Sequence, residues 1–171
     1  MIATVAGFVD YFGGVRRRTR EFFSAIPAGH VDWVPRPGEY SCGDIVRHVA
    51  AAEAMFVGAV VDGHWRYAGH IRAVAPTLTA ALAHLDAGHV EASARLRGLA
   101  DSALQQTRPS LEPGAREVHT WRLLLAMVEH EVHHRSQLAS YLTLMGVEAP
   151  DIFGLGVEDV ERLTAHAAGR T

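Results

Sequence analysis

Residues 130–137 read HEVHHRSQ, which places three histidines and a glutamate within five positions. His130 and His134 are four residues apart, and this spacing sets two imidazoles one turn apart on the same side of a helix. The string also contains His-Glu-x-x-His, the pattern with which zinc proteases hold their metal. Such a motif predicts a metal site only where the rest of the chain supplies a further ligand and a suitable fold.

The histidines can be sorted by the helix face on which they lie. At about 100° per residue, His130 and His134 share the apolar stripe of their helix, whereas His133 falls on its polar side. In the helix expected at residues 41–61, His48 also lies on the apolar face. A lone histidine there is usually structural, but three desolvated imidazoles in one bundle would be costly unless they bind a divalent metal. We therefore expect His48, His130 and His134 to be metal ligands, with coordination positions left open as in a catalytic site.

Other polar side chains near these positions allow more than one interpretation. Glu131 precedes Arg135 by four residues, which favours an intrahelical ion pair, although Glu131 could instead accept a proton from metal-bound water. Glu53 could orient a ligand or pair with a cation. His89 could be a fourth ligand, could support a ligand, or could lie at the rim of the helix, which is favoured. Cys42 lies near a helix start, where a thiol can be acidified, but a thiol without a role is favoured.

Helical periodicity dominates the chain and predicts an all-α fold. Apolar residues recur at alternating steps of three and four, Ser41 and Asp44 form a candidate capping box, and Gly146 with Pro150 marks a helix end. Strand-like alternation is absent. We expect one domain over residues 1–171, a four-helix bundle. Its helices are expected at about residues 4–25, 41–61, 77–106 (the longest by this pattern) and 117–145, followed by a loop and a possible short helix within 146–171.

Composition narrows the possible partners and location. The formal net charge of −3 gives no indication of nucleic-acid binding, and we interpret the basic run at residues 16–20 as the solvent-facing side of a helix. A single cysteine favours a reducing cytoplasm. No apolar run reaches the length of about eighteen residues needed to span a membrane, and the first twenty residues do not have the order of a signal peptide.

Two longer stretches resemble the DinB/YfiT-like superfamily of bacterial four-helix-bundle metalloproteins. The segment VDWVPRPGEYSCGDIVRHVAAAEAMF is similar to the Trp-x-Pro-x-Pro-Gly-x-x-Ser stretch that leads into a histidine-bearing helix in that family. The segment MVEHEVHHRSQLASYLTLMGVEAPDIFG is similar to its His-x-x-x-His-Arg-Gly-Gln motif, with Ser136 in place of the glycine. The resemblance implies a metal triad at His48, His130 and His134, with Arg135 and Gln137 matching the family's arginine and glutamine.

The resemblance also implies a chemistry. Characterised relatives resemble enzymes that use mycothiol, bacillithiol or glutathione, with zinc or nickel as the metal, and such proteins are often homodimers. We therefore expect a thiol S-transferase acting on a small-molecule electrophile, in which Arg135 could steer an anionic thiol. A hydrolase that uses metal-bound hydroxide and a non-enzymatic metal-stabilised bundle that binds a small molecule are the alternatives. A zincin protease is disfavoured, because zincins commonly use a strand and a third ligand downstream of the helix, and the chain offers no strand and no matching extension.

Overall fold

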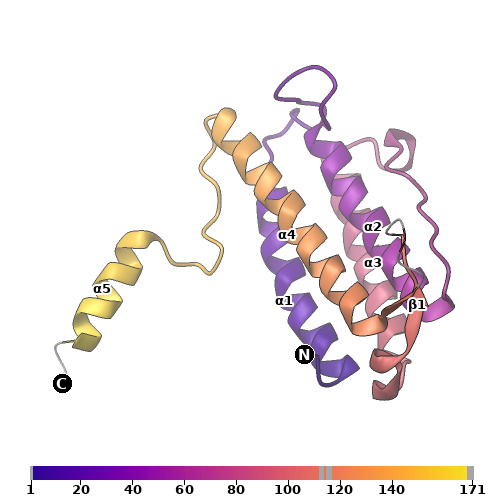
Figure 1. Ribbon diagram of the computed structural model, residues 1–171. Coiled ribbons are helices and arrows are strands. Elements are labelled where there is room, and N and C mark those ends of the chain that lie inside the picture. Colours follow the sequence, from indigo (N-terminus) through magenta and orange to yellow (C-terminus); the bar gives the residue numbers. More distant parts are fainter. Residues whose placement is uncertain (1, 112–113, 115–116, 169–171) are drawn as a thin grey trace.

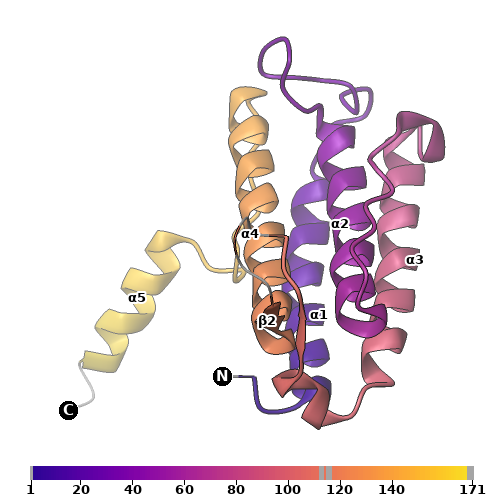
Figure 2. The same ribbon diagram turned by 45° about the vertical axis from the view of Figure 1, so that its right-hand side comes forward.

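The computed structural model describes residues 2–111, 114 and 117–168. Four long helices lie side by side as a bundle (Figures 1 and 2), which confirms the predicted fold class. They are α1 (Val5–Ser24), α2 (Cys42–Asp62), α3 (Leu78–Arg97) and α4 (Thr120–Leu144). The shorter elements are η1 (Arg72–Val74), η2 (Asp101–Gln105), β1 (Thr107–Pro109), β2 (Glu117–His119) and α5 (Val157–Ala168).

Side-chain caps fix where three of the bundle helices begin. Ser41 accepts a hydrogen bond from the backbone N–H of Asp44, and the Asp44 carboxylate accepts one from the backbone of Ser41, so the predicted capping box is confirmed. Thr4 caps α1 and Thr77 caps α3 in the simpler one-sided way. The capping box positions the first turns of α2, and with them the helix that carries His48.

The apolar core has two parts that follow one another along the bundle. One part is built around Phe12, Phe56 and Leu124, and the other around Phe23, Ile45 and Leu138. Between these parts, each helix of the bundle contributes a residue to one cluster of polar side chains. These residues are Arg16 from α1, Glu53 from α2, His89 from α3 and Glu131 from α4. The polar level therefore interrupts the core near the middle of the bundle.

The segment between α3 and α4 differs from the prediction. The helix expected at 77–106 ends at Arg97, and α4, with 25 residues, is the longest helix described. Ala103 and Leu104 are buried, as the apolar spacing predicted, but the backbone there forms a 3₁₀ helix. The spacing therefore extends past the end of the α-helix, which is why the predicted helix was too long. The expectation of no strands was also wrong, since β1 and β2 form a short antiparallel hairpin with Thr107 opposite His119.

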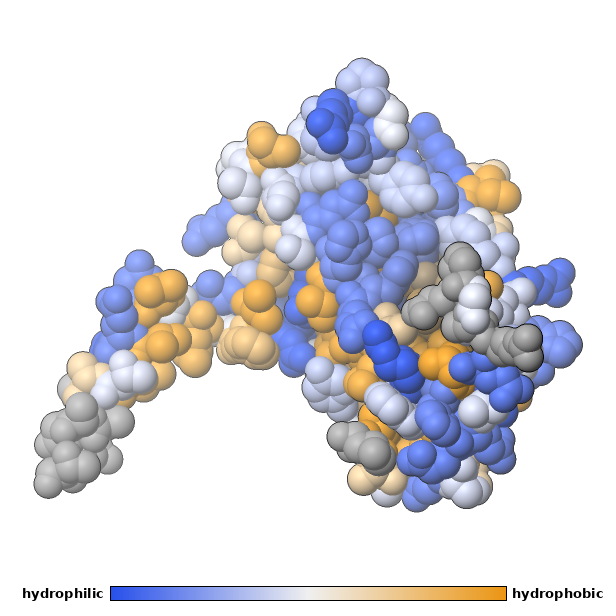
Figure 3. Space-filling view, in the orientation of Figure 1, coloured by the Kyte–Doolittle hydropathy of each residue, from blue (hydrophilic) through white to orange (hydrophobic). Residues whose placement is uncertain are grey.

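The C-terminal part leaves the bundle on an extended segment that leads to α5, the short helix predicted within 146–171 (Figures 1 and 2). Apolar side chains are exposed along it (Figure 3): Ile152, Phe153, Leu155, Val157, Val160 and Leu163. The guanidinium of Arg18 lies 5.4 Å from the centre of the Phe153 ring. Among the described residues, no helix combines the length and apolar character needed to cross a bilayer.

Candidate metal centre

Three histidines from two helices converge on one side of the bundle. α2 contributes His48, and α4 contributes His130 and His134 from consecutive turns. Their ligand-capable nitrogens all lie within 4.8 Å of one another, and the Nε2 atoms of His48 and His130 are 3.0 Å apart. His134 is buried, whereas the other two are half-buried. The predicted convergence of these side chains is confirmed, and it links residues 82 positions apart in the chain.

Neighbouring polar groups orient two of the three rings. The Nδ1 of His134 lies 2.9 Å from Oε1 of Gln137, so Nδ1–H donates and Nε2 keeps its lone pair. Gln137 is held in turn, because its amide N–H donates to the hydroxyl of Tyr141 at 3.2 Å. The Nδ1 of His48 lies 2.6 Å from the hydroxyl of Tyr67. Both rings therefore direct Nε2 into the cluster, as metal-binding histidines do.

The electrostatics of the cluster favour neutral imidazoles. Burial, reinforced by the neighbouring histidines, lowers the pKa of His48 to about 4 and that of His130 to about 3. Burial also lowers the pKa of His134, against the hydrogen bond to Gln137. Divalent metals bind neutral imidazole, so binding at neutral pH would not have to displace protons from these rings. The donor set fits a zinc or nickel ion with open coordination positions.

Glu131 takes part in a different cluster. Its Oε2 lies 2.8 Å from Nη2 of Arg16, and the same nitrogen lies 2.7 Å from Oε2 of Glu53. The other oxygen of Glu53 lies 2.7 Å from Nδ1 of His89. The expected intrahelical ion pair with Arg135 was therefore wrong, because α1 supplies a buried arginine closer to the carboxylate. Burial raises the pKa of Glu131, and Arg16 opposes that rise.

The other residues considered from the sequence lie outside the triad. Arg135 is buried, with its guanidinium carbon 6.0 Å from the centre of the Phe22 ring, and burial lowers its pKa. His133 is exposed, as the face analysis predicted. His89 contacts Glu53 and the Phe12 ring rather than the triad. Cys42 is fully buried, and burial raises its pKa to about 11, which is the opposite of an activated thiol.

Sequence reasoning missed three residues of these clusters. Arg16 belongs to the basic run interpreted as solvent-facing, but only 3% of its surface is exposed. Tyr67 and His70 follow α2, and the hydroxyl of Tyr67 lies 2.9 Å from Nδ1 of His70. The spacing of Arg16 from Phe12 and Thr19 could have placed it on the buried face. Nothing in the pattern of the loop indicated Tyr67 or His70.

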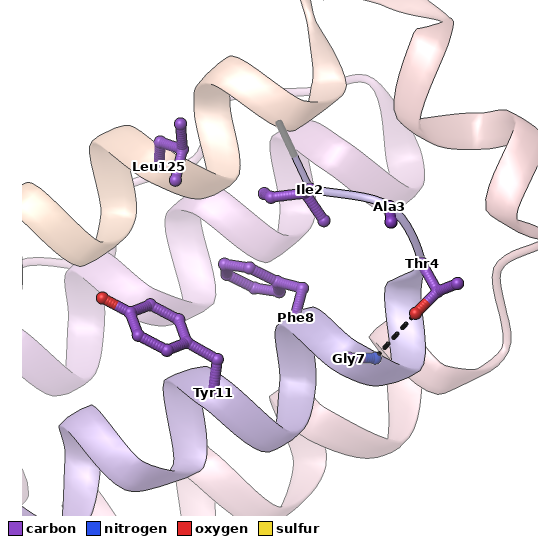
Figure 4. Close-up of a pocket in the computed structure, with 7 residues that line it drawn as sticks. All are labelled: Ile2, Ala3, Thr4, Gly7, Phe8, Tyr11 and Leu125. Carbon is purple, nitrogen blue, oxygen red and sulfur yellow. Dashed lines mark hydrogen bonds between the residues drawn. The ribbon is translucent and has the colours of Figure 1, made fainter.

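A cleft of about 390 Å³ at the start of α1 lies apart from this centre. Ile2, Phe8 and Tyr11 line it together with Leu125 of α4 (Figure 4), and the Tyr11 hydroxyl is the one titratable side-chain group among its lining residues. Its lining residues include no histidine, cysteine or carboxylate, the groups that most often bind metals or transfer protons. The triad is the better candidate for a functional site.

The part of the chain that carries the triad matches a known family. The family model described as the DinB superfamily matches residues 11–138, which include all three histidines of the triad. The chain belongs to the DinB superfamily.

Solved DinB-like proteins share the fold of this superfamily member. One from Bacillus subtilis is 23% identical, with a TM-score of 0.68, and the match covers 85% of this chain and 96% of the other. One from Bacillus cereus is 15% identical, with a TM-score of 0.72, and the match covers 88% and 99%. No curated protein matches the chain.

Proposed function

We propose that this DinB-superfamily protein is a metal-dependent enzyme that transfers a low-molecular-weight thiol to a small electrophile. The observation that carries the proposal is the convergence of His48, His130 and His134 within 4.8 Å, in the absence of a carboxylate hydrogen-bonded to any of the three among the described residues. A bound divalent ion would lower the pKa of a coordinated thiol, so that the thiol reacts as a thiolate near neutral pH. Zinc and nickel are the proposed metals, and bacillithiol, mycothiol and glutathione are candidate thiols.

The chain's own residues hold the ligands and limit water. Gln137 and Tyr67 hold the His134 and His48 rings with Nε2 directed inward. Tyr40 packs against His48, with ring centres 5.6 Å apart, and so covers the loop side of the triad. In the reaction a sulfur–carbon bond forms while the bond from that carbon to its leaving group breaks. The leaving group departs with the bonding electrons, and the thiol proton passes to solvent.

Thiol transfer is favoured over hydrolysis by the position of the carboxylates. General-base catalysis of water attack needs an acceptor within hydrogen-bonding reach of the water. Glu53 and Glu131 are both bound to Arg16 in the bundle interior. Glu129, the other carboxylate beside His130, is exposed and pairs with Arg122. A thiol bound to a metal ion would ionise more readily than a bound water molecule, because the free thiol has the lower pKa, so a thiolate nucleophile depends less on such a base.

The proposal is tested with protein reconstituted with zinc or nickel. Plasma mass spectrometry of the wild type should give near-stoichiometric metal, which His48→Ala, His130→Ala and His134→Ala should lose and the exposed control His133→Ala should keep. The same samples are assayed by absorbance for thioether formation from glutathione or cysteine and chlorodinitrobenzene. Thioether formation should follow metal content across the series.

Two results would overturn the proposal. Stoichiometric metal combined with ester hydrolysis, and without thioether formation from any thiol offered, would identify a hydrolase. A wild type that binds neither zinc nor nickel after reconstitution would leave a bundle that binds a small molecule without metal.

A further inference from the structure

Two clefts of different character lie on either side of the triad along α4. The first has a volume of about 200 Å³ and uses α4 residues 122–126; the second, of about 330 Å³, uses α4 residues 137–144. His130 and His134 lie between these two stretches of one continuous helix. Because an α-helix rises about 1.5 Å per residue, each cleft begins within about one to two turns of a triad ligand.

The first cleft is apolar and reaches the triad through one aromatic ring. The Phe56 ring lies 6.0 Å from the His130 ring and 5.5 Å from the Trp65 ring. The indole N–H of Trp65 donates to the carbonyl of Pro109 at 2.7 Å, which ties this wall to the β1–β2 hairpin. Leu123 and Ala126 complete the floor from α4. Arg122 lies at the edge of this cleft and pairs with Glu129, which is not among the lining residues, so the floor and the inner wall are apolar.

The second, more polar cleft is lined mainly by charged and polar residues and reaches the triad through Gln137. The Gln137 side chain contacts both His134 and Tyr141, and Ser140 lies between them on the same helix. The opposite wall comes from the loop before α2, where Arg36 and Glu39 form an exposed ion pair at 2.8 Å. An exposed pair of this kind contributes little to stability, so its two charges can exchange partners with a ligand. One cation beside one anion complements the carboxylate and ammonium groups of a zwitterionic amino acid.

We infer that the two clefts divide the substrates between them. The polar cleft takes the zwitterionic amino-acid end of a thiol such as glutathione, and the apolar cleft takes the apolar group of the electrophile, an alkyl or aromatic group that fits about 200 Å³. The sulfur and the electrophilic carbon then meet between the clefts, beside the triad. This assignment rests on the proposed thiol transfer and adds the class of each substrate.

The test uses cobalt-loaded protein, because a thiolate bound to cobalt gives a charge-transfer band that reports binding without turnover. One probe is a series of straight-chain alkanethiols of increasing length, and the other is glutathione. In the wild type, each added methylene should tighten binding by up to about fourfold. Ala126→Leu fills the apolar cleft and should flatten this dependence on chain length, while glutathione binds within about twofold of wild type.

Ser140→Leu is the matched substitution in the polar cleft, at an exposed helical position. It should weaken glutathione binding by about tenfold or more and leave the chain-length dependence intact. Leu111→Ser removes apolar surface at the exposed rim of the first cleft and should reduce that dependence even if Ala126→Leu fails to fold. Cobalt content and helical circular dichroism are measured for each variant.

The outcomes separate this inference from the proposed function. Bands that form while the chain-length dependence survives both Ala126→Leu and Leu111→Ser, or while glutathione binding survives Ser140→Leu, overturn the division of the clefts and leave thiol binding in place. Cobalt-loaded wild type that gives no band with any thiol overturns both.

Discussion

Two polar clusters at the middle of the bundle show opposite chemistry. The triad of His48, His130 and His134 contains three like groups, all neutral, whose nitrogens face one another with few hydrogen-bond donors among them. The second cluster joins Arg16 to Glu53 and Glu131, so that a cation is surrounded by anions at 2.7 and 2.8 Å. The triad contains no cation, whereas the second cluster contains the guanidinium of Arg16.

This difference separates a candidate binding site from a structural element. Buried charges that pair with one another tie helices together and leave no demand for an external cation. Converging lone pairs without a cation create such a demand, which a metal ion can meet. Although Glu131 lies between two triad residues in sequence, it belongs to the structural cluster because its side chain turns toward α1.

The largest expected effect concerns metal occupancy. His130→Ala should reduce bound zinc from near one ion per chain to almost none, while the free energy of unfolding of the metal-free protein changes by about 1 kcal/mol or less. Chelation of metal from the wild type should likewise leave the helical circular dichroism intact. If the metal-free protein unfolded, the triad would be a structural metal site, because proteins with closed structural sites lose their fold with their metal. The contrast between the two clusters would then not hold.

Arg16→Met should reduce stability and leave metal binding unchanged. Removing the arginine leaves two buried carboxylates without a cation, which should lower the free energy of unfolding by about 3 to 5 kcal/mol. Zinc content per folded molecule should not change, because the guanidinium of Arg16 contacts Glu53 and Glu131 rather than the triad. Urea unfolding and plasma mass spectrometry on the same samples measure both quantities. Adding Glu131→Gln should recover part of the loss, whereas Arg17→Met at an exposed position serves as the control.

Cys42 provides a buried titratable group that belongs to neither cluster. Its pKa is raised from 9.0 to about 11 by burial, so the folded state holds the thiol proton more tightly than the unfolded state does. The resulting stability is complete below pH 9 and is lost as pH rises toward 11, by about 2 to 3 kcal/mol. Tyr67 and Tyr141 also have pKa values raised by burial, so urea unfolding from neutral pH upward should show a loss in both proteins that is larger, by this amount, in wild type than in Cys42→Ala. Rapid alkylation of native Cys42 at neutral pH would contradict its burial.

Tyr67→Phe removes a hydroxyl that orients the proposed metal ligand His48 and leaves His48 itself in place. Without the hydroxyl, Nδ1 of His48 loses its partner, and zinc affinity should fall by about tenfold. Competition with a chromophoric chelator measures the affinity, and the number of ions bound at saturating zinc should remain unchanged. His70→Ala, one contact farther from the triad, should have a smaller effect. An equal loss in both variants would mean that the loop as a whole matters more than this hydrogen bond.

Helical spacing predicted the bundle and the convergence of the histidines. His130 and His134 share a face whatever the rest of the chain does, and His48 was identified by the apolar neighbours on its own helix. The same reasoning misplaced Arg16, because an arginine in a basic run is normally solvated. Its burial depends on Glu53 and Glu131, which lie 37 and 115 residues away along the chain, so no local pattern could reveal it.

The amino-acid sequence by itself therefore determined the helices, their apolar faces and the residue types that can bind metal, since these depend on spacing within a single helix. Tertiary structure decided which polar groups meet. It directed Glu131 to Arg16 instead of Arg135, placed His89 on Glu53, and brought Tyr67 to His48 from a loop. Those pairings follow from helix packing, which brings together side chains that are distant in sequence. Burying each polar side chain costs free energy, and its contacts with the others compensate that cost.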